Sequence, residues 1–145
     1  MNAYFFDTSA LVKRYVLELG SLWVNTLINQ PTTRVYISRL AEAEVSAALT
    51  RRLPSADAVR ILHNFDHDVA TSYIRLTITD TVIDHAVQLT RGQRLRGCDS
   101  LQLATALQLA QIENPIIFVC SDSDLLTAAS AESLSVKNPE LHGEE

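Results

Sequence analysis

The sequence contains few of the residues that mark several common classes of protein. Only four glycines occur in 145 residues, and none belongs to a phosphate-binding loop or a dinucleotide fingerprint, so a P-loop or dinucleotide-dependent enzyme is not expected. The two cysteines, Cys98 and Cys120, are too few for a disulfide framework and are predicted to be small buried residues in a reducing compartment. No apolar run approaches the ~20 residues that span a bilayer, so no membrane association is expected.

Basic residues are also in deficit, because the formal net charge is −5. This balance argues against a protein that coats polyanions, which would carry a basic surplus. It is compatible with an enzyme that acts on nucleic acid through a local basic rim around an acidic centre. The N-terminus shows no basic segment followed by an apolar stretch and a cleavage site, so a cytoplasmic location is expected.

Short apolar runs alternate with helical patterns along most of the chain. Such alternation is typical of an α/β fold, in which helices cover both faces of a parallel sheet. We therefore predict a single domain over 1–140, with a central parallel sheet of about four to five strands flanked by helices, and a frayed tail at 141–145. The predicted strands are 3–6, 35–37, 74–78, 116–120 and 134–136.

Two acids lie just past the ends of predicted strands. Asp7 comes after the apolar run 3–6, and a helical pattern begins at once through Ala10 and Leu11. Asp122 repeats this layout after 116–120. In α/β proteins, ligands bind beyond the carboxyl ends of parallel strands. Each acid taken alone is more simply explained as a helix N-cap.

Two further acids belong to predicted helices. Glu44, in the helix 39–52, has small apolar residues three and four positions away on both sides. It is therefore predicted to face inward, where a carboxylate needs a hydrogen-bond partner, a counter-charge or a metal. On its own, Glu44 is equally consistent with a snorkelled or Arg-paired glutamate at the edge of the core. Asp99 opens a strongly apolar helix and by itself is most simply an N-cap, as is Asp80 for the helix that follows it.

Capping accounts separately for Asp7, Asp99 and Asp122 but not for Glu44, whereas convergence on one site accounts for all four. Four carboxylates close together raise one another's pKa unless a divalent cation neutralises them. Oxygen ligands without a His or Cys cluster favour Mg²⁺ or Mn²⁺ over zinc. Such a site activates water and stabilises charge on phosphoryl oxygens.

Each of the four acids lies in a longer motif. The motifs are Phe6-Asp7-Thr8-Ser9-Ala10-Leu11-Val12-Lys13, Glu44-Val45 with Ala47-Ala48-Leu49, Asp99-Ser100-Leu101-Gln102-Leu103-Ala104-Thr105-Ala106, and Asp122 with Leu125-Leu126 and Ala128-Ala129. In order and spacing they resemble the acidic motifs of PIN-domain ribonucleases, above all VapC-type toxins of toxin–antitoxin pairs. The resemblance implies a Mg²⁺- or Mn²⁺-dependent endoribonuclease that leaves a 5′-phosphate and a 3′-hydroxyl. It also implies an RNA substrate (tRNA or another structured RNA), a VapB-like antitoxin as inhibitor, and a homodimer.

The resemblance further implies roles for individual residues. Asp7 and Asp99 would be the principal metal ligands. Glu44 would bind the metal or orient the attacking water, and Asp122 would complete the site. Supporting roles or phosphate contacts are implied for Ser9, Ser121 and Asp124, and RNA-backbone contacts for Lys13, Arg14, Arg39, Arg51, Arg52, Arg94 and Arg96.

Other α/β classes remain alternatives. A receiver-like phospho-acceptor module requires adjacent acids after the first strand, whereas Asp7 is followed by Thr8 and Ser9. It also requires a lysine after a late strand, where this chain has Ser121 and Asp122. An aspartyl-phosphatase requires a second acid at the position of Ser9. A PIN-like domain that serves only as a non-catalytic binding scaffold would not need all four acids.

Overall fold

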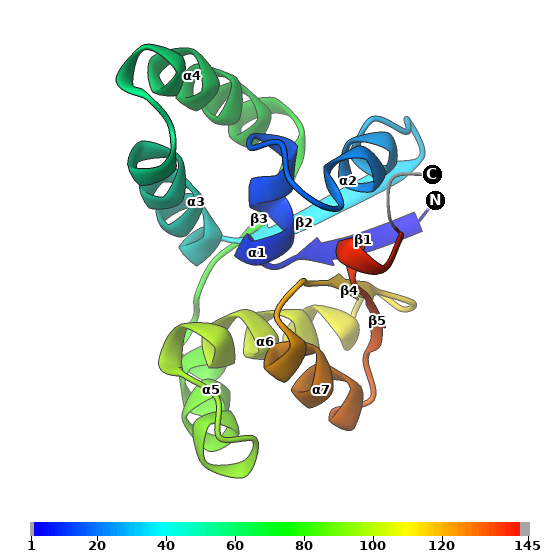
Figure 1. Ribbon diagram of the computed structural model, residues 1–145. Helices are drawn as coiled ribbons and strands as arrows, with labels where there is room; N and C mark the ends of the chain where they lie inside the picture. The colour runs from blue at the N-terminus through cyan, green and yellow to red at the C-terminus, as the bar shows by residue number, and fades with distance from the viewer. Residues whose placement is uncertain (1, 143–145) are drawn as a thin grey trace.

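The computed structural model of the chain describes residues 2–142. Five parallel strands form one sheet in the order β3-β2-β1-β4-β5 (Figure 1). This confirms the predicted α/β class, with a parallel sheet flanked by helices. The central position of β1 explains its uninterrupted apolar sequence, because a strand covered on both faces has no solvent side. The strands are β1 Asn2–Phe6, β2 Thr33–Ser38, β3 Tyr73–Leu76, β4 Ile117–Val119 and β5 Ser135–Lys137.

Helices cover both faces of the sheet. Phe5 and Phe118 stack at a centroid distance of 5.7 Å on the face that packs against α5, α6 and α7. Phe6 and Ile37 belong to the opposite face, which packs against α1 to α4. Alternate residues of one strand therefore serve two separate hydrophobic cores. The helices are α1 Thr8–Leu11, η1 Val12–Arg14 (3₁₀), α2 Ser21–Ile28, α3 Arg39–Arg52, α4 Ser55–Thr71, α5 Asp80–Gly92, α6 Gly97–Ala110, α7 Ser123–Ala131 and η2 Pro139–His142 (3₁₀).

The boundaries of several elements differ from those predicted. Tyr73, expected in the last turn of a long helix, instead begins β3, where it pairs with Val35 and is buried. The strand predicted at 74–78 is accordingly shifted toward the N-terminus. Its apolar alternation marked the strand but not its ends, because boundary residues depend on partners distant in sequence.

Two acids expected as N-caps lie in the first turn of their helices instead. The Thr79 hydroxyl caps α5 by accepting the Val82 N–H at 3.2 Å, so Asp80 is the first residue of α5. Helix α6 begins at Gly97, two residues before Asp99. The Asp99 carboxylate is therefore free of capping, and the positive end of the helix dipole stabilises its charge.

The carboxyl end of the sheet brings distant segments together. The parallel register pairs Phe6 with Val119, and the Asp7 N–H donates to the Val119 carbonyl at 2.9 Å. β2 is parallel to β1, so α3 also starts at this edge. The three segments that follow β1, β2 and β4 carry predicted site residues, and they thus begin side by side at this edge.

The predictions from the lack of long apolar runs and from the two cysteines can be compared with the structure. None of the helices within residues 2–142 is long and apolar enough to cross a bilayer. Cys120 is buried as predicted, but Cys98 is exposed. Cys98 lies in the first turn of α6, at the surface.

The C-terminal segment packs against α2. Of the residues 141–145 predicted to fray, Leu141 and His142 close η2, and the His142 ring stacks on Trp23 at a centroid distance of 4.5 Å. Residues 143–145 lie outside the described residues.

Candidate metal centre

Asp7 lies at the junction of β1 and α1 and is 5% exposed. Its Oδ2 accepts hydrogen bonds from the Ser9 N–H (3.2 Å), the Ser9 hydroxyl (2.7 Å) and the Cys120 thiol (3.6 Å). It is thus the N-cap of α1. Burial raises the pKa of Asp7 to about 6; the hydrogen bonds from Ser9 oppose the rise, and the charge of Asp99 adds to it. Asp7 is therefore both a helix cap and a buried acid with an acidic neighbour.

Asp122 occupies the equivalent place after β4. Its Oδ1 accepts the backbone N–H groups of Asp124 (3.0 Å) and Leu125 (3.1 Å) and caps α7. Its Oδ2 lies 4.0 Å from Nη2 of Arg96. Asp124, in contrast, is exposed and lines a separate cavity together with Arg94. Of these two acids, the structure places Asp122 with the other predicted ligands.

Asp99 approaches the same region from the first turn of α6. Arg96 Nε donates to Asp99 Oδ2 at 3.1 Å, so one guanidinium extends toward two acids. Burial raises the pKa of Asp99, Arg96 lowers it, and the charges of Asp122 and Glu44 raise it. Because Asp99 also raises the pKa of Asp7, all four carboxylates share one electrostatic environment.

Glu44 enters the site from α3. It is half-buried beside the buried stripe of this helix, not within it as predicted. Its Oε1 accepts hydrogen bonds from the Thr8 hydroxyl (2.8 Å) and the Gln102 amide (3.1 Å). Two neutral donors hold Glu44, and no Arg or Lys pairs with it among residues 2–142. The alternative of an Arg-paired glutamate is therefore not observed.

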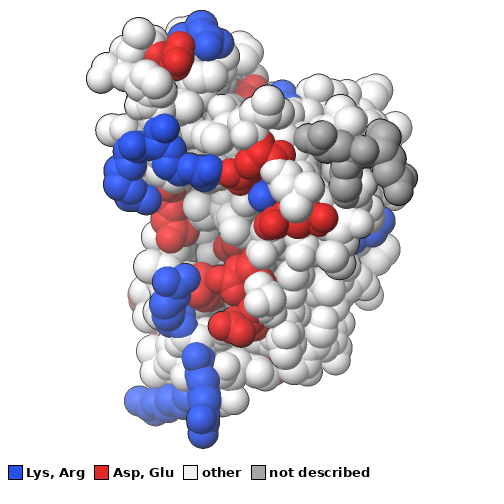
Figure 2. Space-filling view, in the orientation of Figure 1, with Lys and Arg blue, Asp and Glu red and all other residues white. Residues whose placement is uncertain are grey.

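Each of the four carboxylates is anchored through one oxygen. Within residues 2–142, the second oxygen of Asp7, Glu44 and Asp99 receives no hydrogen bond, and that of Asp122 has only the guanidinium 4.0 Å away. An anchored carboxylate can ligate through its other oxygen without losing its support. Figure 2 shows acidic side chains gathered near the centre of this face, with basic side chains along one side.

This donor set fits a hard divalent cation in its chemistry. All four ligand groups are carboxylates, and their mutual repulsion favours a cation between them. No three His, Cys, Asp or Glu side chains within residues 2–142 lie close enough to form a ready-made metal cage. In the described part of the chain, the four carboxylates thus do not form a preorganised cage for an ion.

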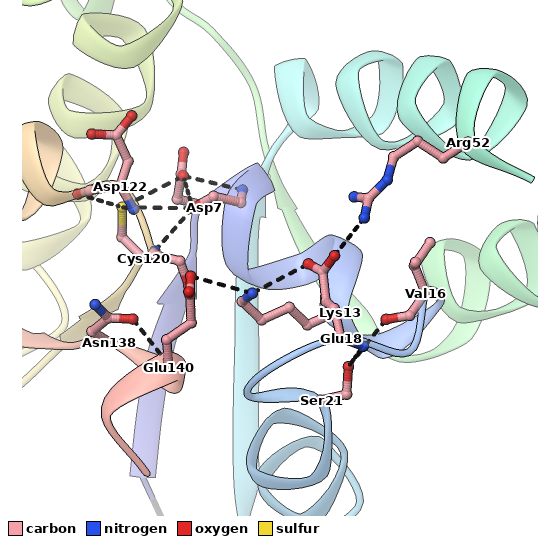
Figure 3. A network of polar contacts seen from close by, with 12 residues as sticks. Asp7, Lys13, Val16, Glu18, Ser21, Arg52, Cys120, Asp122, Asn138 and Glu140 are labelled. Carbon is pink, nitrogen blue, oxygen red and sulfur yellow. Dashed lines mark hydrogen bonds and ion pairs between the residues drawn. The ribbon is translucent and has the colours of Figure 1, made fainter. Parts of the chain in front are cut away.

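A cavity of about 280 Å³ adjoins Asp122, and both acidic and basic side chains line it. One lining residue is Lys13, whose side chain is only 5% exposed; its ammonium lies 3.2 Å from Glu18 and 3.4 Å from Glu140 (Figure 3). Arg52 reaches Glu18 from α3. Lys13, predicted to contact the RNA backbone, is thus a buried part of the cavity wall whose charge is paired with Glu18 and Glu140.

The other basic residues predicted to contact RNA differ in their surroundings. Arg14 Nε lies 3.2 Å from Asp68 of α4, so this ion pair connects η1 to that helix. Arg39 is ion-paired within α3 but exposed. Arg94 and Arg96 are exposed just before the segment that carries Asp99. These two remain the best placed to meet a phosphate.

Comparison with known proteins identifies the class that this fold and site define. The family model of the PIN domain matches residues 4–131, and the chain belongs to the PIN-domain family. Ribonuclease VapC45 of Mycobacterium tuberculosis is 34% identical over 149 residues, which cover 97% of this chain and 99% of that protein. Within the family, the chain is therefore one of the VapC ribonucleases, as the four motifs indicated.

Solved structures share the fold at lower identity. FitAcB from Neisseria gonorrhoeae gives a TM-score of 0.71 at 18% identity, covering 94% of this chain and 97% of that chain. A toxin–antitoxin complex from Klebsiella pneumoniae gives 0.66 at 19% identity, with 94% and 97% covered. These likenesses confirm the PIN-like architecture.

Three polar residues at the site were not predicted: Thr8, Gln102 and Cys120. Thr8 and Gln102 bind Glu44, while the Cys120 thiol donates to Asp7. The sequence offered only a weak signal for Gln102: α6 contains two glutamines, of which Gln102 is buried and Gln108 is exposed, and a buried amide requires partners.

Proposed function

We propose that this chain is a metal-dependent endoribonuclease that hydrolyses RNA phosphodiester bonds and acts as the toxin of a VapBC-type pair. The observation that supports this most directly is the group of four carboxylates at the carboxyl edge of the sheet, each anchored through one oxygen. Membership of the VapC ribonucleases supports the reaction class. When bound, Mg²⁺ or Mn²⁺ would activate water and stabilise charge on the phosphoryl oxygens.

Each of the four acids would have a role that follows from its surroundings. Asp7 and Asp99 would hold the cation, and Asp122 would complete the site. Glu44 would ligate the cation or orient the attacking water through its second oxygen. Water adds to phosphorus while the bond to the 3′-oxygen breaks, which leaves a 5′-phosphate and a 3′-hydroxyl that takes up a proton. Ser9 would keep Asp7 oriented by its two hydrogen bonds to Oδ2.

The surroundings of the site suggest its partners. Exposed Arg94 and Arg96 on one side would contact the phosphates of a structured RNA such as a tRNA. The net charge of −5 would suit a basic segment of a VapB-like antitoxin. The Klebsiella neighbour is a toxin–antitoxin complex, which supports such a partner. Family membership likewise supports a homodimer located in the cytoplasm.

Cleavage of a panel of RNAs, tRNAs included, tests the proposal. Protein free of antitoxin would be assayed with Mg²⁺ or Mn²⁺, with chelator, and as the Asp7→Asn variant; Asp66→Asn, an exposed acid on α4, serves as the matched control. We expect cutting that requires both metal and Asp7 and that tolerates the control substitution. Cutting by folded Asp7→Asn at the wild-type rate would refute the metal-site assignment. Absence of both metal binding and cutting would favour the scaffold alternative.

A further inference from the structure

Gln102 connects α6 to three other parts of the site. Its side chain is fully buried, and its amide has a partner at every group. Oε1 accepts from the Ser38 hydroxyl at 3.0 Å, while Nε2 donates to Thr8 Oγ1 at 3.1 Å and to Glu44 Oε1 at 3.1 Å. Ser38 ends β2 and caps α3, and Thr8 begins α1. A glutamine in a core helix thus joins elements from both faces of the sheet.

The direction of these hydrogen bonds follows from the donors available. Ser38 Oγ accepts the Ala41 N–H at 3.3 Å and donates its own proton to Gln102. A flipped amide would place Gln102 Oε1 against Glu44 Oε1, two acceptors facing each other, so this orientation is excluded. Thr8 accepts from Gln102 and donates to Glu44 Oε1 at 2.8 Å. Both donors therefore converge on one oxygen of Glu44.

We propose that Gln102 is a positioning residue, which holds Glu44 by Oε1 so that Oε2 is presented to the acidic site. The inference rests on the proposed metal-dependent function. A glutamate side chain has several staggered rotamers, and two directed hydrogen bonds to one oxygen select among them. Removing such a supporting group typically costs 10–100-fold in metal affinity or activity. A positioning role also accounts for the amide in a helix where an apolar side chain would avoid desolvation.

The test is a double-mutant cycle between Gln102→Met and Glu44→Gln. Methionine keeps the length of the side chain but removes the amide. In the wild-type background we expect the Mn²⁺ dissociation constant, from calorimetric titration, to rise and kcat for RNA cleavage to fall, each about 10–100-fold. KM for RNA should change less than about twofold. In the Glu44→Gln background, Gln102→Met should add less than about twofold to either effect, because Gln102 acts only through Glu44.

A control on the same helix separates positioning from loss of packing. Thr105 is also buried, but its hydroxyl donates only to the Leu101 carbonyl of α6, at 2.7 Å. Thr105→Val should therefore leave Mn²⁺ affinity and kcat unchanged. If Gln102→Met fails to fold, Gln102→Leu, which also lacks the amide, takes its place in the cycle.

Two outcomes would overturn the role of Gln102: undiminished Mn²⁺ affinity and kcat in Gln102→Met, or equal losses with and without Glu44. A wild-type protein that binds Mn²⁺ but cuts no RNA would instead refute the proposed ribonuclease function. The Mn²⁺ cycle would still decide whether Gln102 positions Glu44.

Discussion

Asn in place of Asp7 should remove activity and at the same time stabilise the metal-free protein. The carboxylate is buried beside a second acid, and its pKa is raised from 3.8 to about 6. Because the pKa of Asp7 is higher in the folded than in the unfolded protein, protonated Asp7 contributes to the free energy of unfolding. This contribution is fully present at a pH below the unfolded-state pKa, and it is lost as the pH rises through 6. At neutral pH the ionised Asp7 therefore destabilises the fold. Asparagine has no charge to bury and is about as good an N-cap.

The size of the effect follows from the two pKa values. A difference of 3.8 against about 6 corresponds to roughly 3 kcal/mol at pH 7.5. The amide forms weaker hydrogen bonds with Ser9 than the charged carboxylate does, so we expect a net gain of about 1–3 kcal/mol. At pH 4 most of the charge penalty is absent. The gain should therefore be about 2 kcal/mol larger at pH 7.5 than at pH 4.

Urea unfolding in chelator at the two pH values measures this gain, with Asp66→Asn as a control for loss of a surface charge. Added Mn²⁺ should then stabilise the wild type, by about 2.7 kcal/mol at a concentration of 100 Kd, and leave Asp7→Asn almost unchanged. An Asp7→Asn protein less stable than wild type at pH 7.5, or a gain equal at both pH values, would refute the reasoning.

Further predictions concern the surroundings of the acids and the two cores. Arg96→Ala removes the guanidinium that extends toward Asp99 and Asp122, so Mn²⁺ should bind up to about fivefold more tightly. KM for RNA should rise, and weaker Mn²⁺ binding would contradict this prediction. Asp68→Ala leaves Arg14 and Tyr15 without their shared partner and should cost about 1–3 kcal/mol in urea unfolding, with kcat of the folded fraction unchanged. Leu103→Ala, in the core between α6 and the sheet, should cost about 2–5 kcal/mol by the same assay.

The fold was largely predictable because its signals are local. A strand covered on both faces must be apolar along its whole length, so the run that became β1 could be recognised without knowledge of its partners. Positions of acids relative to strand ends were equally visible for Asp7 and Asp122. The ends of elements were less predictable: Thr79 and Asp80 are adjacent and both are preferred N-cap residues, and the sequence did not show which of them would cap α5.

The support of the site was not predictable, since it depends on contacts between distant residues. Gln102 meets Thr8 and Glu44 across 94 and 58 positions of the chain. The burial of Lys13 depends partly on Glu140, which belongs to the C-terminal 3₁₀ helix. A single sequence shows a lone amide or a cation at such positions, but it does not show the groups that satisfy them.

The pairing of β1 with β4 determines when the site can form during synthesis. The Asp7 N–H bonds to the carbonyl of Val119, so these strand ends can meet only after the ribosome has released residue 119 of 145. A shorter nascent chain already contains Asp7, Glu44 and Asp99, but it lacks the strand that aligns Asp122 with them. Contacts of such long range form late in folding. The four acids can therefore be brought together only once β4 is available to pair with β1.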